Sequence, residues 1–70
     1  MNKEKIRHGK TYLIYKNNFL NTSIDYDIKE YIENLKYLIT LHSKVKFKDE
    51  TIRTKLLVYQ DLLDEAMEKF

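Results

Sequence analysis

The chain has 70 residues, a formal net charge of +2 at pH 7 and no cysteine. This length allows one small domain over residues 1–70, and the lack of cysteine excludes disulfides and thiolate metal sites. The near-neutral charge argues against the strong basic stripe that is typical of nucleic-acid-binding domains.

The N-terminal segment and the composition bear on where the protein works. Residues 1–10 are charged, and no apolar run in the chain is long enough for a secretory signal or a membrane-spanning helix. For the same reason we expect no membrane partner, and because the chain starts at Met1 we expect a complete small reading frame. Lys, Ile, Asn and Tyr are abundant, a bias that is typical of AT-rich genomes such as those of low-GC bacteria and their phages. We therefore expect a cytoplasmic protein of a bacterial host cell.

The first third of the chain reads as a flexible tail followed by a β-hairpin. Residues 1–9 are polar, and we expect them to be flexible. The run Thr11–Tyr15 is β-branched and aromatic, which favours a strand. Asn17 and Asn18 suit a two-residue turn. These signals predict a β-hairpin over residues 10–24.

A helix is the alternative for the same segment. A helix over Lys10–Leu20 would place Tyr12, Tyr15 and Phe19 on one face. The chain would then be an all-α three-helix bundle.

The pattern over residues 27–43 predicts a long amphipathic helix. Asp27 followed by Glu30 is typical of a capped helix start. Apolar side chains recur at steps of four and three, which is the spacing of one buried helix face. The residues of this stripe are Ile28, Ile32, Leu35, Ile39 and His42.

A second helix is predicted over residues 49–69, with Asp49 as its cap. Its stripe also steps by four and three: Ile52, Leu56, Tyr59, Leu63, Ala66 and Phe70. Further apolar residues make this face wider than one neighbouring helix can cover. The helix should therefore contact a further element besides the first long helix. Between the helices, residues 44–48 alternate lysine with a large apolar residue. This pattern indicates either a short strand or a loop whose Val45 and Phe47 cover the end of the core.

The predicted fold is therefore α+β and helix-dominated, with an N-terminal β-hairpin followed by an antiparallel two-helix hairpin. Leu35 and Leu63 should lie at the centre of the contact between the two helices.

Several residues are candidates for a protein interface. Val58 and Leu62 lie to one side of the predicted helix contact, and Tyr37 lies opposite the stripe of its own helix. An acidic group on the second helix could face a basic groove on a nucleic-acid-binding enzyme. Its members are Asp61, Asp64, Glu65 and Glu68.

Two basic patches, over residues 3–16 and 44–55, support an alternative in which the chain binds nucleic acid. Basic residues beside aromatic ones suit single strands, whose phosphates and bases they can contact. The candidate contacts are Lys10, Lys44, Lys46, Lys48, Arg53 and Lys55.

No catalytic, metal or cofactor site is indicated. His42 lies on an apolar helix face, but no nucleophile or orienting carboxylate stands at a recognisable spacing from it. We expect a half-buried His42 with its hydrogen bonds satisfied, no enzyme activity and no cofactor.

One stretch of the chain resembles a known family. Ile32-Glu33-Asn34-Leu35 and Tyr59-Gln60-Asp61-Leu62-Leu63-Asp64 are similar to motifs of the small two-helix aspartyl-phosphate phosphatases of sporulation phosphorelays. The serine of the family's second motif is missing, Asp64 is out of register with Gln60, and residues before Ile32 have no counterpart. The resemblance implies a shared helical hairpin only.

The function predicted from the sequence is that of a small non-enzymatic protein-binding regulator or inhibitor. Its target would be a host defence or nucleic-acid-processing enzyme, as for the proteins that phages and mobile elements use against their hosts, anti-CRISPR proteins among them. Self-association as a homodimer is a further expectation, because a domain this small is marginally stable by itself.

Overall fold

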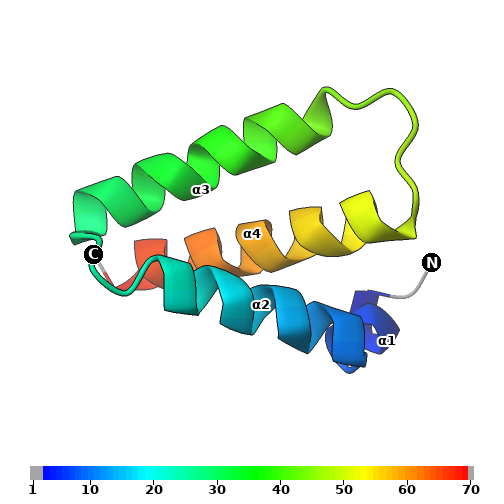
Figure 1. The fold of residues 1–70 in the computed structure, drawn as a ribbon, viewed down its shortest axis with the longest axis horizontal. Coiled ribbons are helices and arrows are strands. Elements are labelled where there is room, and N and C mark those ends of the chain that lie inside the picture. The colour runs from blue at the N-terminus through cyan, green and yellow to red at the C-terminus, as the bar shows by residue number, and fades with distance from the viewer. Residues whose placement is uncertain (1–2, 70) are drawn as a thin grey trace.

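All the regular structure that the chain forms over residues 3–69 is helical. The computed structural model describes the backbone of these residues and the side chains of residues 5–69. It contains α1 (Lys3–Arg7), α2 (Lys10–Thr22), α3 (Ile28–Ser43) and α4 (Glu50–Glu68). Helix α4 packs against both α3 and α2, and α1 packs beside the start of α2 (Figure 1).

The predicted β-hairpin over residues 10–24 is wrong, because this segment forms α2 and the described part of the chain is all-α. Tyr12 and Phe19 are buried and Tyr15 is half-buried, on the face that the helical alternative assigned to them. Residues 17–18 continue the helix instead of forming a turn. Burying two aromatic side chains against α4 outweighs the local preference for strand and turn.

Within residues 1–9, which we expected to be flexible, residues 3–7 form α1, while residues 1–2 lie outside the description. Helix α1 ends at Arg7, and the Gly9 amide donates a hydrogen bond of 3.0 Å to the Ile6 carbonyl oxygen. A Cβ atom at Gly9 would lie 3.2 Å from that oxygen, so glycine allows the close turn between α1 and α2.

Both long helices begin at the caps that the sequence predicts. The Asp27 carboxylate accepts a 2.8 Å hydrogen bond from the Glu30 amide at the start of α3. The Asp49 carboxylate accepts one of 2.9 Å from the Ile52 amide at the start of α4. Each cap satisfies an amide that has no partner within its own helix.

The core lies where α2 and α3 meet on α4. Its buried members are Tyr12, Phe19, Leu35, Leu57, Val58 and Leu62. The Phe19 ring makes edge contacts with Tyr31 of α3 and Tyr59 of α4, at centroid distances of 5.5 and 5.7 Å. Phe19 therefore ties α2 to both of the other long helices.

The buried face of each long helix is displaced from the predicted stripe. On α3, Leu35 is fully buried as predicted, but Ile28 is 41% exposed. On α4, Val58 is fully buried and Leu63 is only half-buried. The reason is that α4 has helices on two sides, so the residues between the two contacts are buried most.

The connection between α3 and α4 is neither a strand nor a plug for the core. Residues 45–49 form no regular structure, Phe47 is 82% exposed and Val45 is 37% exposed. The Lys48 ammonium donates a 2.8 Å hydrogen bond to the Val45 carbonyl oxygen, which closes the turn.

Replacing Leu35 by alanine should lower the free energy of unfolding by about 2–5 kcal/mol, because the side chain is fully buried and leaves a cavity. Leu41→Ala, on the same helix but 48% exposed, should change it by less than about 0.5 kcal/mol. Urea denaturation followed by circular dichroism measures both. Equal effects of the two substitutions would contradict this core.

Candidate functional site

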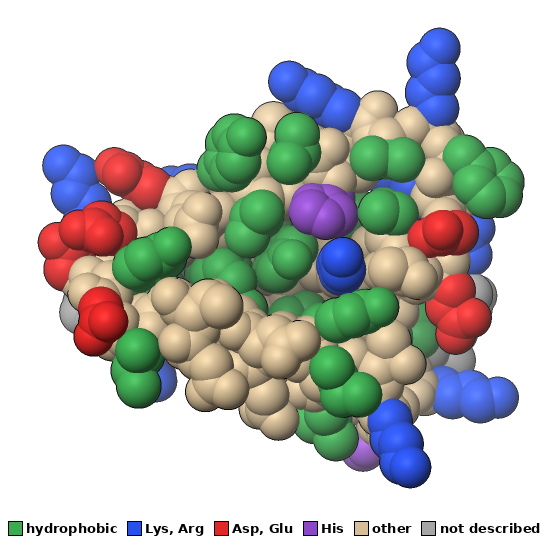
Figure 2. All heavy atoms as spheres, in the orientation of Figure 1, with side chains coloured by type: hydrophobic (Ala, Val, Ile, Leu, Met, Phe, Trp, Pro, Cys, Tyr) green, Lys and Arg blue, Asp and Glu red, His purple; other side chains and the backbone are tan. Residues whose placement is uncertain are grey.

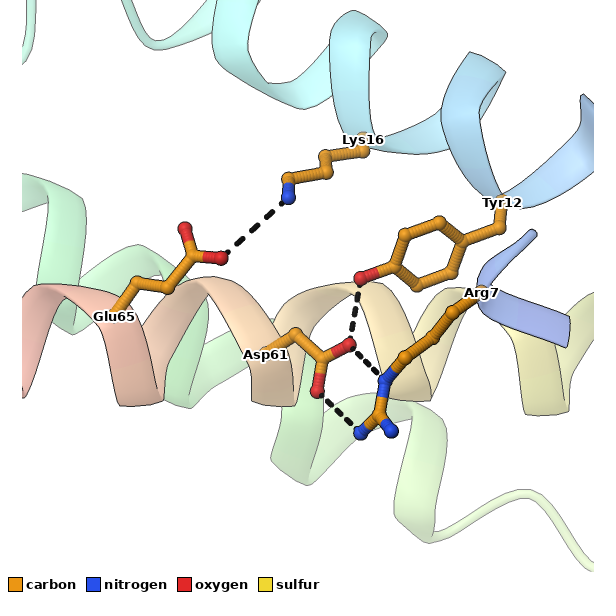
Figure 3. A network of polar contacts seen from close by, with 5 residues as sticks. All are labelled: Arg7, Tyr12, Lys16, Asp61 and Glu65. Carbon is orange, nitrogen blue, oxygen red and sulfur yellow. Dashed lines mark hydrogen bonds and ion pairs between the residues drawn. The ribbon is translucent and has the colours of Figure 1, made fainter. Parts of the chain in front are cut away.

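A polar cluster joins the N-terminal helices to the middle of α4 (Figure 3). The Arg7 guanidinium donates two hydrogen bonds to the Asp61 carboxylate, of 2.9 Å from Nε and 3.0 Å from Nη2. The Tyr12 hydroxyl donates a third, of 2.6 Å, to the same carboxylate. This bidentate, charge-assisted arrangement holds α1 and α2 on α4.

The cluster shifts the pKa values of its members. Hydrogen bonding from the Arg7 guanidinium lowers the pKa of the Asp61 carboxyl below its ordinary value of 3.8, and burial opposes this only in part. Burial, followed by the hydrogen bond to Asp61, raises the pKa of the Tyr12 hydroxyl. Asp61 is therefore a stable anion and Tyr12 a stable neutral donor, which suits a structural contact better than proton transfer.

The predicted acidic surface on α4 is divided between structural and exposed residues. Asp61 is held by Arg7 and Tyr12, and the Glu65 carboxylate lies 3.5 Å from the Lys16 ammonium (Figure 3). Asp64 and Glu68 are exposed. Glu65 is exposed as well, so three of the four predicted carboxylates are accessible, and their role in docking stays a prediction.

Val58 and Leu62 do not lie on an exposed shoulder of α4, as the interface prediction required. Val58 is fully buried and Leu62 is 2% exposed. Helix α2 covers this side of α4 and makes both residues part of the core. Tyr37 is 61% exposed on α3, so it is accessible, and no contact here tests its role at an interface.

His42 is half-buried with its ring nitrogen satisfied. Its Nδ1 lies 2.8 Å from the Leu38 carbonyl oxygen, so this nitrogen carries the proton and donates. The ring also makes an edge contact with Tyr59 at a centroid distance of 5.3 Å. These contacts hold the ring in place as a packing residue.

The six candidate nucleic-acid contacts lie on α2, on α4 and in the connection between α3 and α4. Lys44 and Lys46 are exposed in the connection between α3 and α4, where basic and hydrophobic side chains project together at the right of Figure 2. Lys48 is bonded to its own turn, and the Lys55 ammonium lies 5.2 Å from the centroid of the Tyr15 ring. Lys10 and Arg53 are exposed on α2 and α4 respectively.

The structure forms an apolar groove that the sequence did not indicate. It has a volume of about 580 Å³ and lies between the end of α2, the start of α3 and the end of α4. Three apolar side chains on its wall, Leu20, Tyr26 and Ile28, are each about 40% exposed. The signal that the sequence offered was a pair of apolar residues beside the Asp27 cap, Tyr26 and Ile28, of which Ile28 belongs to the predicted stripe of the helix.

A second hollow lies between α2 and α3, on the face shown in Figure 2, where hydrophobic side chains form its floor. It has a volume of about 370 Å³ and includes the polar side chains of Asn18, Thr22 and Asn34. Its lining is more polar than that of the apolar groove, and Lys55 of α4 is part of it.

Two further findings apply to the described residues. They include no group of three histidine, cysteine, aspartate or glutamate side chains placed to hold a metal ion. None of their helices combines the length and the apolar character needed to cross a membrane.

Comparisons with protein-family models, with curated proteins and with solved structures found no significant match.

The Asp61 cluster should give stability a measurable pH dependence. Because the folded pKa of Asp61 is lowered, the contribution of the cluster is complete above its ordinary pKa of 3.8 and is lost as the pH falls toward the folded pKa. Asp61→Asn should lower the free energy of unfolding at pH 7 by about 1–2 kcal/mol, since the 36% exposure of Arg7 lets water screen the pair.

Urea denaturation at a series of pH values measures this effect. The difference between wild type and Asp61→Asn should shrink as the pH falls below about 4. Asp64→Asn removes an exposed carboxylate from the same helix and is the matched control, which should follow the wild type. A constant difference down to low pH would mean that Asp61 acts through packing and not through its charge.

Proposed function

We propose that this chain is a non-enzymatic regulator or inhibitor that acts by binding another protein in the bacterial cytoplasm. The proposed target is a host defence or nucleic-acid-processing enzyme, and the proposed source is a phage or mobile element of a low-GC bacterium. The composition supports this source, and the exposed apolar surface supports protein binding.

The apolar groove is the observation that carries the proposal. Small folded chains rarely leave a contiguous apolar surface in water unless it binds something. Here Leu20, Tyr26 and Ile28 flank the groove while each stays about 40% exposed, and the nearby Ile24 is 78% exposed. The core already has its own apolar residues, so these side chains are available to a partner.

The groove suits the apolar face of an amphipathic helix on the target. Such helices place side chains one turn apart into a groove between helices. Glu65 and Lys69 stand on the wall of the groove, where they can meet polar residues beside the apolar face of the partner. Their opposite charges favour a partner of mixed charge over a strongly basic or acidic one.

The substitution Ile28→Glu tests the groove. It puts a charge into the groove, while an acidic residue in the first turn of α3 favours the helix, so the fold should be retained. Its affinity for the target should fall by at least about tenfold, the cost of burying a charge in an apolar contact.

The matched control is Leu41→Lys, whose side chain is 48% exposed near the end of α3, where a positive charge is favourable. A target captured from extracts of the source cell is purified, and its affinity for the three proteins is measured by calorimetry. Unchanged binding of Ile28→Glu, or equal losses in both variants, would contradict the groove as the docking site.

Binding of single-stranded nucleic acid is the second candidate, and the exposure of Phe47 favours it. This ring is 82% exposed between Lys46 and Lys48, so a base can stack on it while nearby lysines contact phosphates. Phe47→Ala should weaken binding of a labelled oligonucleotide by about tenfold. Fluorescence anisotropy at several salt concentrations measures this, and absence of binding even at low salt would exclude the candidate.

A further inference from the structure

One exposed flank of α2, beside its core face, carries a second apolar stripe. Leu13 is 49% exposed and Leu20 is 40% exposed, whereas Tyr12 and Phe19, each one position earlier and about 100° around the helix, are buried. Within α2, Leu13, Asn17 and Leu20 are spaced by four and three residues, and Ile24 follows four residues later in the turn after the helix. This is the spacing of a coiled-coil contact. We name these four residues the outer α2 stripe.

We propose that a second copy of this chain covers the outer α2 stripe, with the two α2 helices antiparallel about a two-fold axis at Asn17. In this register, Leu13 of each copy lies beside Leu20 of the other. The two Asn17 amides meet at the axis, where each can donate to and accept from the other. A single asparagine in an apolar helix contact fixes the register at some cost in stability.

Charge favours the antiparallel orientation over the parallel one. Helix α2 contains Lys10 and Lys16 and no acidic residue, and Asp25 follows its end. In the antiparallel pair, Lys10 of each copy lies near Asp25 of the other, at both ends of the contact. The dipoles of the two helices also point in opposite directions, which is the favourable arrangement for neighbouring helices. A parallel pair would bring the two copies of Lys10 together.

The size of the contact sets the strength of the dimer. Thirteen residues of α2 form a helix about 20 Å long, so the pairing buries less surface than a standard protein interface. We therefore expect a dissociation constant in the micromolar range. The proposal does not depend on the groove. Leu20 contributes to both surfaces, so the test of association uses Leu13, which does not line the groove.

Sedimentation equilibrium tests the association. The wild-type mass should rise from 8.6 kDa toward twice that value as the concentration increases to the millimolar range. Leu13→Lys should remain a monomer with an unchanged melting temperature, because the side chain is exposed. Leu41→Lys is the matched control, because the Leu41 side chain is 48% exposed and that of Leu13 is 49% exposed. This variant should associate as the wild type does.

Single cysteines test the register, because the natural chain has none. Asn17→Cys should form a disulfide-linked dimer under mild oxidation, since its two copies meet at the axis. Asn18→Cys is the matched control. It lies about 100° around the helix, beside the hollow between α2 and α3, and should cross-link much more slowly.

Two more variants test the orientation. Leu13→Cys and Leu20→Cys should each stay unlinked alone and should cross-link when they are mixed. Cross-linking of Leu13→Cys with itself would overturn the antiparallel arrangement. A wild type that stays at 8.6 kDa at millimolar concentration would overturn the dimer. If Leu13→Lys then also lost its binding to the target, the stripe would be a contact for the target instead.

Discussion

The structure depends on one constraint: the apolar face of α4 is wider than a single neighbouring helix can cover. Helix α3 covers one side of it and α2 the other, and the most deeply buried side chains, such as Val58, lie between the two contacts. Phe19 joins the two sides through its ring contacts with Tyr31 and Tyr59. Polar contacts to Asp61 then fix α1 and the start of α2 on the same helix.

The sequence was sufficient to predict the two long helices, their caps and the need of α4 for more than one neighbour. It failed for α2, and the reason is physical. Apolar side chains occur on two faces of this helix, with Tyr12 and Phe19 toward the core and Leu13 and Ile14 outside. Two overlapping stripes hide the period of a helix and leave a continuous apolar run, which resembles a strand. Only the tertiary contact with α4 decides between the two.

The candidate sites were less predictable because they depend on pairs that are distant in the sequence. Arg7 and Asp61 lie in the first and last helices, and nothing local to Asp61 distinguishes it from the exposed Asp64. Counting charges along α4 therefore included one carboxylate, Asp61, that is held by contacts within the fold. The groove was missed for the same reason, since its walls come from three separate helices. The exposed position of Tyr37, by contrast, follows from its place on a single helix.

The chain order of the contacts also bears on how the molecule folds. Helix α2 lies next to α3 in the sequence but packs mainly on α4, so its docking must close a loop that contains all of α3. Helices α3 and α4 need only close the short connection between them, which costs less chain entropy. We expect the α3–α4 pair to form first and α2 to dock afterwards. Helix α2 would then also be the first to detach, and a transient opening of the native protein would expose Phe19 and Val58 before α3 and α4 separate.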